Sequence, residues 1–596
     1  MTHANDSEPA AARRKRLIWL GVAAISIVTY IFVIAGNIDK PFGTDEIYYA
    51  GWAHGIAKTG TPAYYSGEGA QFFPRIIEPI SHPTLHFKAL AVMVLVFGLK
   101  YWSLRLLGVI LFLATLLFVR FKILKDEDDA DERLVLTGFF LVFSPMFLQE
   151  SLVLAIEAQA FWFPMLVFLY LFHLETVGEN RFRFYPYLYT TPALITLFWL
   201  KETNVPIYLA VCLIYLALTR NFRKAPGFFL AFGVSVALFW TSWVVYCRIA
   251  DVDVWCWYDF TFRKKLLKGS SGIHKLIAGK GLGAAIDKVL LGLKVSISWL
   301  SGSYAALFFL AAYVRIRDLI KGRSRLGFME LCLIYIVVLF GITKIVRPTP
   351  SFVKYEVPAH FLMAVFMADV YFGIVRKELF AFGTLLVLGG IAGAAAYGVV
   401  PDRLLEMKTF FGTHLLQSLG SALLVGIVLY AVKKKQPYVA AVLGMSASVV
   451  ALNTNLYIHQ STEDYTTGHS WGNYGEDLVA PTKWLRKHMK NGDTIAVFKD
   501  LQFNMRFVEG KTKSPTYEVR MFSKWKRKKR EKAKLLNSGE IRYIVLSRYA
   551  DSSYGRRFIT ENNYRKVARA GKHVIYERKK CPVCRKKKKR RKKKRG

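Results

Sequence analysis

Two adjacent carboxylates followed by two tyrosines stand just after the first apolar segment, in the stretch GTDEIYYAGWAHGIAKTG from Gly43 to Gly60. Asp45 and Glu46 are candidate proton acceptors, because a hydroxyl group is a poor nucleophile until a base takes its proton. Alternatively, Thr44 or Asp45 could cap a helix over residues 46–58, and acidic side chains in its first turn would suit the helix dipole. Capping alone does not account for the neighbouring Tyr49.

Further ionisable side chains are His82 in the first external loop and Arg105 near the start of the second span. Glu150, Glu157 and Lys201 stand at turns between later spans. Ionisable groups in or near a bilayer are costly and commonly serve a function. Each has a structural alternative, such as an ion pair or a lysine that reaches to the membrane surface. Because all of them are expected near one face of the membrane, together they predict a pocket for an anionic group beside a proton acceptor.

The composition indicates an all-α polytopic membrane protein. Of the 596 residues, 53% are hydrophobic, and apolar stretches of about 20 residues recur, each long enough to cross a bilayer. About thirteen crossings are expected, near 17–36, 101–121, 134–150, 157–173, 187–201, 203–219, 226–247, 296–315, 327–346, 357–375, 379–400, 414–432 and 437–456. The apolar run Phe87 to Leu99 is too short to cross and is expected to lie in the interface.

Loop charge predicts the orientation. Four basic residues, 13–16, precede the first crossing, and the loops that alternate with it are rich in Lys and Arg, which places them in the cytoplasm. The expected division is a cytoplasmic basic N-terminus (1–16), a transmembrane domain (17–457) with a first external loop (37–100), an extracytoplasmic α/β domain (458–577) and a disordered basic tail (578–596). The expected location is the cell membrane of a prokaryote.

The external domain is expected to contain an amphipathic helix over 475–490 and strands within DTIAVFKD, IRYIVLSRY and KHVIYER. In the tail, eleven consecutive Lys or Arg residues (585–595) have two readings, a solvated tail or a segment attracted to anionic lipid or envelope polymer. An external location argues against a nucleic-acid partner. Cys581 and Cys584 have metal or redox spacing, although without a second ligand pair.

The motifs, taken in order, resemble those of integral-membrane glycosyltransferases of the C-type fold, in particular the aminoarabinose transferases and protein O-mannosyltransferases. The match extends over most of residues 17–460. It rests on GTDEIYYAGWAHGIAKTG, SHPTLHFKAL, LKYWSLRLLGVIL, SPMFLQESLVLAIEAQAF, LFWLKETNVPIYL and SFVKYEVPAHFLMAV. The chain departs from the family at three positions: Thr84 replaces a second proline, His82 a lysine of the aminoarabinose transferases, and Glu157 an aspartate. These departures leave the sugar and the acceptor open.

The resemblance implies transfer of a sugar, with inversion, from a polyprenyl-phosphate-linked donor to a glycan, lipid or protein acceptor. It makes Asp45 the catalytic base and Glu46 its partner or the alternative base. It assigns the donor phosphate to Lys201, Arg105 and Arg263, and the substrates to Tyr49, His82, Glu150, Glu157, Lys354 and Tyr355. No cofactor is certain, and a divalent metal ion held by Asp45, Glu150 and Glu157 is left open.

Two other classes of function remain as alternatives. A transporter or flippase of a lipid-linked saccharide would account for the many crossings, and it predicts mid-membrane ionisable groups and internal repeats, neither of which is clear in the sequence. A non-catalytic scaffold would account for the basic tail but not for the loop motifs.

Overall fold

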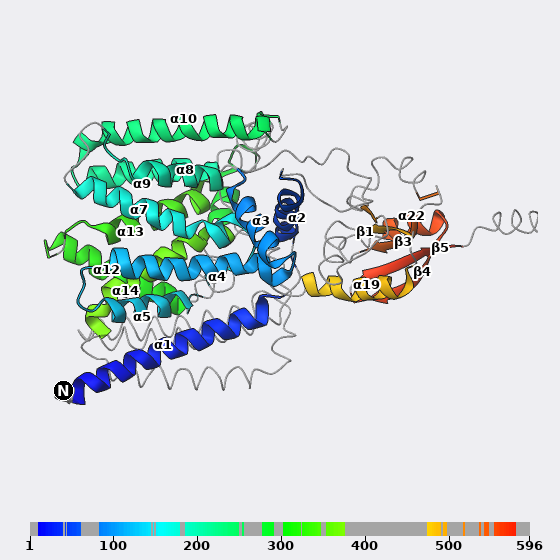
Figure 1. Cartoon of the computed structure of the whole chain (residues 1–596), viewed down its shortest axis with the longest axis horizontal. Coiled ribbons are helices and arrows are strands. Elements are labelled where there is room, and N and C mark those ends of the chain that lie inside the picture. The colour runs from blue at the N-terminus through cyan, green and yellow to red at the C-terminus, as the bar shows by residue number, and fades with distance from the viewer. Residues whose placement is uncertain are drawn as a thin grey trace, which may run out of the picture.

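The computed structural model describes residues 10–39, 42, 44–60, 83–142, 144, 147, 151–178, 185–249, 253–255, 277–279, 281–290, 302–323, 325–346, 353–375, 474–489, 493–497, 516–518, 536–537, 541–546, 553–571 and 573–579. Residues 10–375 of this set form a helical bundle. Those from 474 onward form a small sheet with flanking helices, beyond one end of the bundle (Figure 1).

The bundle consists of helices joined by short 3-10 and π-helical segments. The α-helices are α1 (Ala10–Asn37), α2 (Thr44–Thr59), α3 (Leu85–Phe97), α4 (Tyr101–Phe118), α5 (Ala130–Val142), α7 (Trp162–Val177), α8 (Thr190–Lys201), α9 (Val205–Leu218), α10 (Ala225–Ile249), α12 (Gly302–Ile320), α13 (Phe328–Phe340) and α14 (Val357–Val375). The π-helical segments are η1 (Val119–Ile123), η2 (Ile156–Ala160) and η6 (Gly341–Val346). The 3-10 segments are η3 (Glu202–Asn204), η4 (Phe222–Lys224) and η7 (Val353–Glu356).

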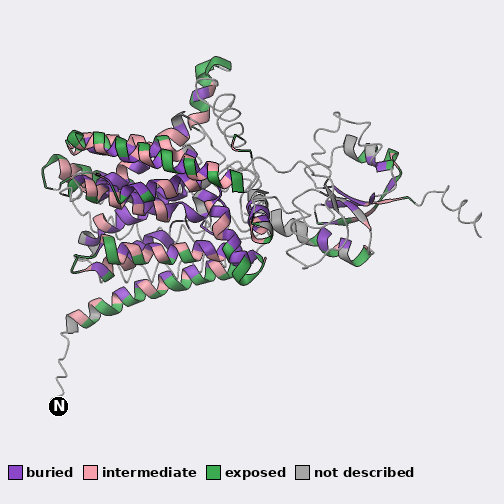
Figure 2. Ribbon diagram, turned by 45° about the horizontal axis from the view of Figure 1, so that its top comes forward, coloured by how far each residue is buried: buried purple, intermediate pink, exposed green. Residues whose placement is uncertain are grey.

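The bundle has the apolar exterior of a membrane protein. Among the described residues, three helical stretches are long and apolar enough to cross a bilayer: Lys15–Asn37, Tyr101–Ile123 and Phe222–Ile249. Large apolar side chains such as Val28 and Phe32 of α1 are 66% and 68% exposed, and Figure 2 shows exposed positions along the length of this helix. Exposed apolar surface of this extent indicates contact with lipid.

The helices follow the expected crossings with some differences in their ends. α3 coincides with the short run that the sequence places in the interface, and α14 starts and ends where expected. The helix expected at 134–150 ends earlier, at Val142, because Ser144 precedes Pro145 and the position before a proline disfavours helix. The crossings expected at 379–400, 414–432 and 437–456 lie outside the described residues. The total of about thirteen therefore stays a prediction.

Charged side chains within the bundle meet partners on other helices. Arg133 of α5 pairs with Asp369 of α14 at 2.9 Å, and Arg315 of α12 contacts Glu330 of α13. Lys15 of α1 reaches Glu132 of α5 at 3.0 Å. These pairs fix the neighbours of the helices, because in a low-dielectric environment a charge without a partner is costly.

The C-terminal part is a mixed five-stranded sheet in the order β2-β1-β3-β5-β4. Its strands are β1 (Thr494–Val497), β2 (Thr516–Glu518), β3 (Ile541–Leu546), β4 (Tyr564–Ala570) and β5 (His573–Arg578), and its helices are α19 (Tyr474–His488) and α22 (Ser553–Glu561). α19 and three strands lie where the sequence predicts them. Strands β2 and β4 were not predicted. The sequence of β4, YRKVARA, carries three basic residues and reads as a polar loop.

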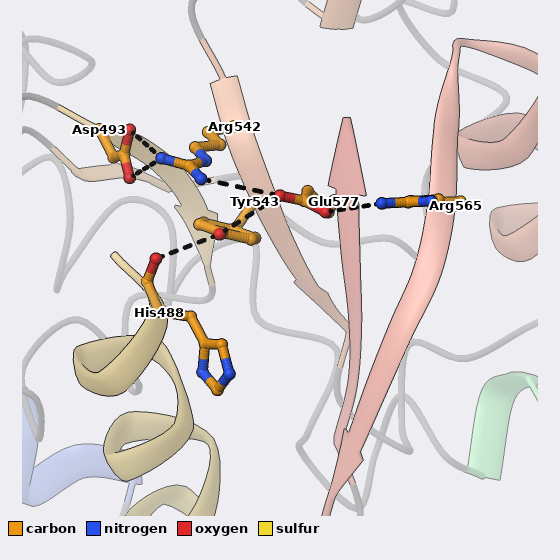
Figure 3. A network of polar contacts seen from close by, with 6 residues as sticks. All are labelled: His488, Asp493, Arg542, Tyr543, Arg565 and Glu577. Carbon is orange, nitrogen blue, oxygen red and sulfur yellow. Dashed lines mark hydrogen bonds and ion pairs between the residues drawn. The ribbon is translucent and has the colours of Figure 1, made fainter. Parts of the chain in front are cut away.

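A row of alternating charges runs across neighbouring strands of this sheet (Figure 3). Arg542 on β3 donates to both carboxylate oxygens of Asp493, at 2.8 and 2.6 Å, and lies 3.8 Å from Glu577 on β5. Glu577 also pairs with Arg565 on β4 at 3.3 Å, and with the hydroxyl group of Tyr543 at 3.4 Å. Cross-strand pairs of this kind specify the register of neighbouring strands.

Candidate active site

The structure describes some predicted site residues with their side chains, some by their backbone alone, and others not at all. The side chains of Glu46, Tyr49, Arg105, Lys201 and Tyr355 are described. The backbones of Asp45, Glu157 and Lys354 lie in α2, η2 and η7, but nothing is described of their side chains. His82, Glu150 and Arg263 lie outside the described residues. The proposed metal site of Asp45, Glu150 and Glu157 therefore stays a prediction.

Glu46 and Arg105 form a buried ion pair. Nη2 of Arg105 donates to both carboxylate oxygens of Glu46, at 3.1 and 3.2 Å, and the residues are 1% and 7% exposed. Nη1 of Arg105 donates to the carbonyl oxygen of Ile38 at 3.2 Å, and its guanidinium lies 4.9 Å from the ring centroid of Phe42. This pairing gives both residues a structural role, while their assignment as base and phosphate ligand stays a prediction.

The same carboxylate joins the acidic motif to the segment that carries Glu157. Oε1 of Glu46 accepts a hydrogen bond from the backbone N–H of Leu154 at 3.2 Å, two residues before η2 begins. Residue 45 is the neighbour of Glu46 in the first turn of α2. The pair therefore places the backbone of the predicted base beside the turn that leads into η2.

Two contacts with α4 hold η2 and the turn before it in place. Gly108 of α4 lies against the backbone of Ser151, so that a Cβ atom at this glycine would come 2.5 Å from the Ser151 carbonyl oxygen. Nε2 of Gln159 donates to the carbonyl oxygen of Leu104 at 2.9 Å. η2 is a π-helical segment, and such segments are frequent at functional sites.

Lys201 and Tyr355 are in contact beside η2. Lys201 is the last residue of α8, is 7% exposed, and places its ammonium group 4.7 Å from the ring centroid of Tyr355. Tyr355 lies in η7, which packs against η2. A lysine that merely reached to the membrane surface would be exposed, so burial disfavours that alternative. The segments of Asp45, Glu157, Lys354, Tyr355 and Lys201 are thus joined in one chain of contacts.

Two groups of buried polar residues were given no role from the sequence. Lys344 of η6 forms an ion pair with Glu356 of η7, and both side chains are 1% exposed. Its signal in the sequence is a lysine inside an apolar segment, which is rare without a partner or a function. His86 of α3 is fully buried and lies 6.0 Å from the ring of Tyr49, centroid to centroid. Among the described residues, no group of three or more His, Cys, Asp or Glu side chains is arranged to hold a metal ion.

No protein-family model matches the sequence, and no curated protein matches it significantly. Several solved structures are similar to this chain. ArnT from Cupriavidus metallidurans bound to undecaprenyl phosphate superposes with a TM-score of 0.58 at 14% sequence identity, over 93% of this chain and 97% of that chain. The apo form of ArnT gives a TM-score of 0.58 at 14% identity, over 95% of this chain and 98% of that one.

A further likeness is to the apo form of an Archaeoglobus fulgidus oligosaccharyltransferase, with a TM-score of 0.47 at 12% identity over 91% of this chain and 71% of that chain. Identities this low establish the fold and not the reaction. The ArnT likeness extends through nearly the whole length of both chains. The protein therefore has the C-type fold of integral-membrane glycosyltransferases, as its motifs predict.

Proposed function

We propose that the protein is a membrane glycosyltransferase that moves a sugar from a polyprenyl-phosphate-linked donor to an acceptor hydroxyl group. The observation that carries the proposal is the contact chain from Glu46 through Leu154 and η2 to Tyr355 and Lys201. It brings an acidic motif and a buried cation to one region of an ArnT-like fold. The ArnT structure with bound undecaprenyl phosphate supports a polyprenyl lipid as the donor carrier.

In the proposed reaction, Asp45 takes the proton of the acceptor hydroxyl as its oxygen attacks the anomeric carbon. The bond from the anomeric carbon to the phosphate oxygen breaks on the opposite side, so that the configuration inverts and polyprenyl phosphate leaves as an anion. Lys201 stabilises the negative charge that grows on the leaving phosphate. Tyr355 holds the Lys201 ammonium in place through its ring, since an aromatic face attracts a cation.

Glu46 has the better-supported role of a positioning residue. Its carboxylate already accepts hydrogen bonds from Arg105 and from the backbone of Leu154, which leaves Asp45 as the stronger candidate for the base. The proposed orientation, with this region and the C-terminal sheet on the outer face, follows from the basic loops. The acceptor class stays open among glycan, lipid and protein.

The decisive test is a transfer assay with full-length protein in proteoliposomes and a panel of polyprenyl-phosphate sugars. Asp45→Asn should lower the rate by about 10²- to 10⁴-fold, as expected for loss of a general base. Asp287→Asn, which changes an exposed carboxylate in the same way, is the matched control and should keep full activity. Full transfer by Asp45→Asn would remove Asp45 as the base. A wild-type protein that moved labelled lipid-linked sugar across the bilayer without transfer would support the flippase alternative.

A second variant tests the leaving-group role. Lys201→Met should slow the transfer step, and it should weaken donor use more than acceptor use, because only the donor carries the phosphate. The measurement is the ratio of kcat/KM values for the two substrates against wild type. An equal loss for donor and acceptor would indicate that Lys201 holds the fold of α8 instead.

A further inference from the structure

Lys88 of α3 is a half-buried cation held between aromatic rings. Its ammonium nitrogen lies 4.1 Å from the ring centroid of Tyr246 on α10 and 5.2 Å from that of Trp199 on α8. Among the described residues, the ammonium group takes part in no ion pair or hydrogen bond, and these two ring contacts are its interactions. Three helices therefore converge on one ammonium group that has no carboxylate partner there.

Several other cations of the bundle have carboxylate partners. Arg105 meets Glu46, Lys344 meets Glu356, and Arg133 meets Asp369. A charge without a counterion in a low-dielectric region is expensive, and aromatic faces offset only part of that cost. A cation with no counterion among the described residues is a candidate site for an anionic ligand.

The surroundings of Lys88 favour a phosphate group attached to a lipid. The lysine lies near the start of α3, where the positive end of the helix dipole adds to its attraction for anions. Trp199, Trp243 and Tyr246 belong to one apolar cluster with Cys247, which offers a wall to a hydrocarbon chain. Trp199 also precedes the end of α8, where Lys201 lies, by only two residues.

We propose that Lys88, Trp199 and Tyr246 form a binding site for the phosphate group of a lipid, with the ammonium against the phosphate and the rings against the adjoining chain. Two lipids carry this chemistry, the polyprenyl phosphate carrier and an anionic phospholipid of the bilayer. In the first case the inference rests on the proposed function and makes Lys88 a second cation for the donor. In the second case it is independent of that function.

The test is lipid binding by the full-length protein in phosphatidylcholine nanodiscs, measured by native mass spectrometry with polyprenyl phosphate and, separately, with phosphatidylglycerol. Lys88→Met should weaken binding of at least one of these lipids by about tenfold or more, the effect of losing one charge-assisted contact. Lys88→Arg keeps the charge and should stay close to wild type, which separates loss of the site from loss of the fold.

Lys100→Met is the matched control. Lys100 also lies over an aromatic ring, with its nitrogen 5.3 Å from the ring centroid of Trp102, but it is exposed at the start of α4. Its substitution should leave both affinities unchanged. A loss confined to polyprenyl phosphate would assign the site to the carrier, and a loss confined to phosphatidylglycerol would assign it to a bilayer lipid.

Unchanged binding of both lipids by Lys88→Met would overturn the inference. The outcome is separable from that of the proposed function. Lipid binding that depends on Lys88 in a protein without transferase activity would keep the site and reject the enzyme. Transfer that is normal in Lys88→Met, with normal lipid binding, would keep the enzyme and reject the site.

Discussion

Two regions of the molecule place opposite charges beside one another with opposite consequences. In the bundle, Glu46 and Arg105 are almost fully buried, and their opposite charges lie against each other away from water. On the C-terminal sheet, Arg565 pairs with Glu577 while its side chain is 63% exposed. Water can replace the partner of Arg565 but not that of Arg105. Burial, and not the contact distance, therefore decides how strongly each pair is needed.

The largest expected effect comes from breaking the buried pair on one side only. Arg105→Met should lower the free energy of unfolding by about 3–5 kcal/mol, because it leaves the Glu46 carboxylate buried without its cation. The double variant Arg105→Met/Glu46→Leu should recover much of the loss, since neither charge then remains. Unfolding in mixed micelles gives the comparison. Equal stability of the single and double variants would show that the pair is not buried in the way described.

The next effect tests the packing that supports the same region. Gly108→Ala should lower the free energy of unfolding by about 1–3 kcal/mol, because its Cβ atom would come 2.5 Å from the Ser151 carbonyl oxygen and force α4 and the turn apart. Gly138→Ala in α5 is the control, since no atom lies within 4 Å of the added carbon. That change should be neutral or stabilising by up to about 1 kcal/mol, as alanine favours helix.

A buried tyrosine on the sheet gives a smaller effect that depends on pH. Tyr564 donates to the carbonyl oxygen of Ile541 at 2.8 Å, and Tyr564→Phe should cost about 1 kcal/mol at neutral pH. Burial raises the pKa of Tyr564 from 10.0 to about 12. The unfolded chain then ionises first, so this stabilisation is complete below about pH 10 and falls as the pH rises to about 12.

Pulse proteolysis in urea at several pH values, with detection of the C-terminal fragment, measures that dependence. Between pH 10 and 12 the wild type should lose stability, and Tyr564→Phe should show a smaller decrease. Identical pH curves would mean that other groups cause the alkaline loss.

The smallest effect is expected for the exposed ion pair of Arg565 and Glu577. Arg565→Ala should change the free energy of unfolding by less than about 1 kcal/mol, and added salt should reduce the change further. Arg542→Ala should cost more, because Arg542 contacts both oxygens of Asp493 and is only 32% exposed. If the two variants were equally damaging, burial would not be the deciding variable on the sheet.

The sequence predicted the helical class, the fold and the places of most described helices, because runs of apolar residues and loop charge report directly on the bilayer. It predicted strands β1, β3 and β5, which are apolar. It missed β2 and β4, and the exposed basic residues of β4 lie on an edge strand. Helix ends were less accurate where a proline or a π-helical segment interrupts an apolar run, as near Val142 and Ile156.

For the site, the sequence named Glu46 and Arg105 but assigned them separately, as base partner and phosphate ligand. That the two meet could not be inferred, since they are 59 positions apart and nothing in either motif specifies the other. The Lys344–Glu356 pair and the ring contacts of Lys88 were missed for the same reason. The sequence shows which residues carry charge. Tertiary packing decides which of those charges are neutralised by a partner.

The carboxylate of Glu46 bridges three stretches of backbone, since it binds Leu154 directly and Ile38 through Arg105. A scan of the acidic motif by activity alone would therefore be misleading. An inactive Glu46 variant would look like a lost catalyst even if its only fault were that these three stretches had drifted apart. The activity of Glu46 variants should be measured per correctly assembled molecule. By that measure, their activity should differ from that of variants substituted at position 45.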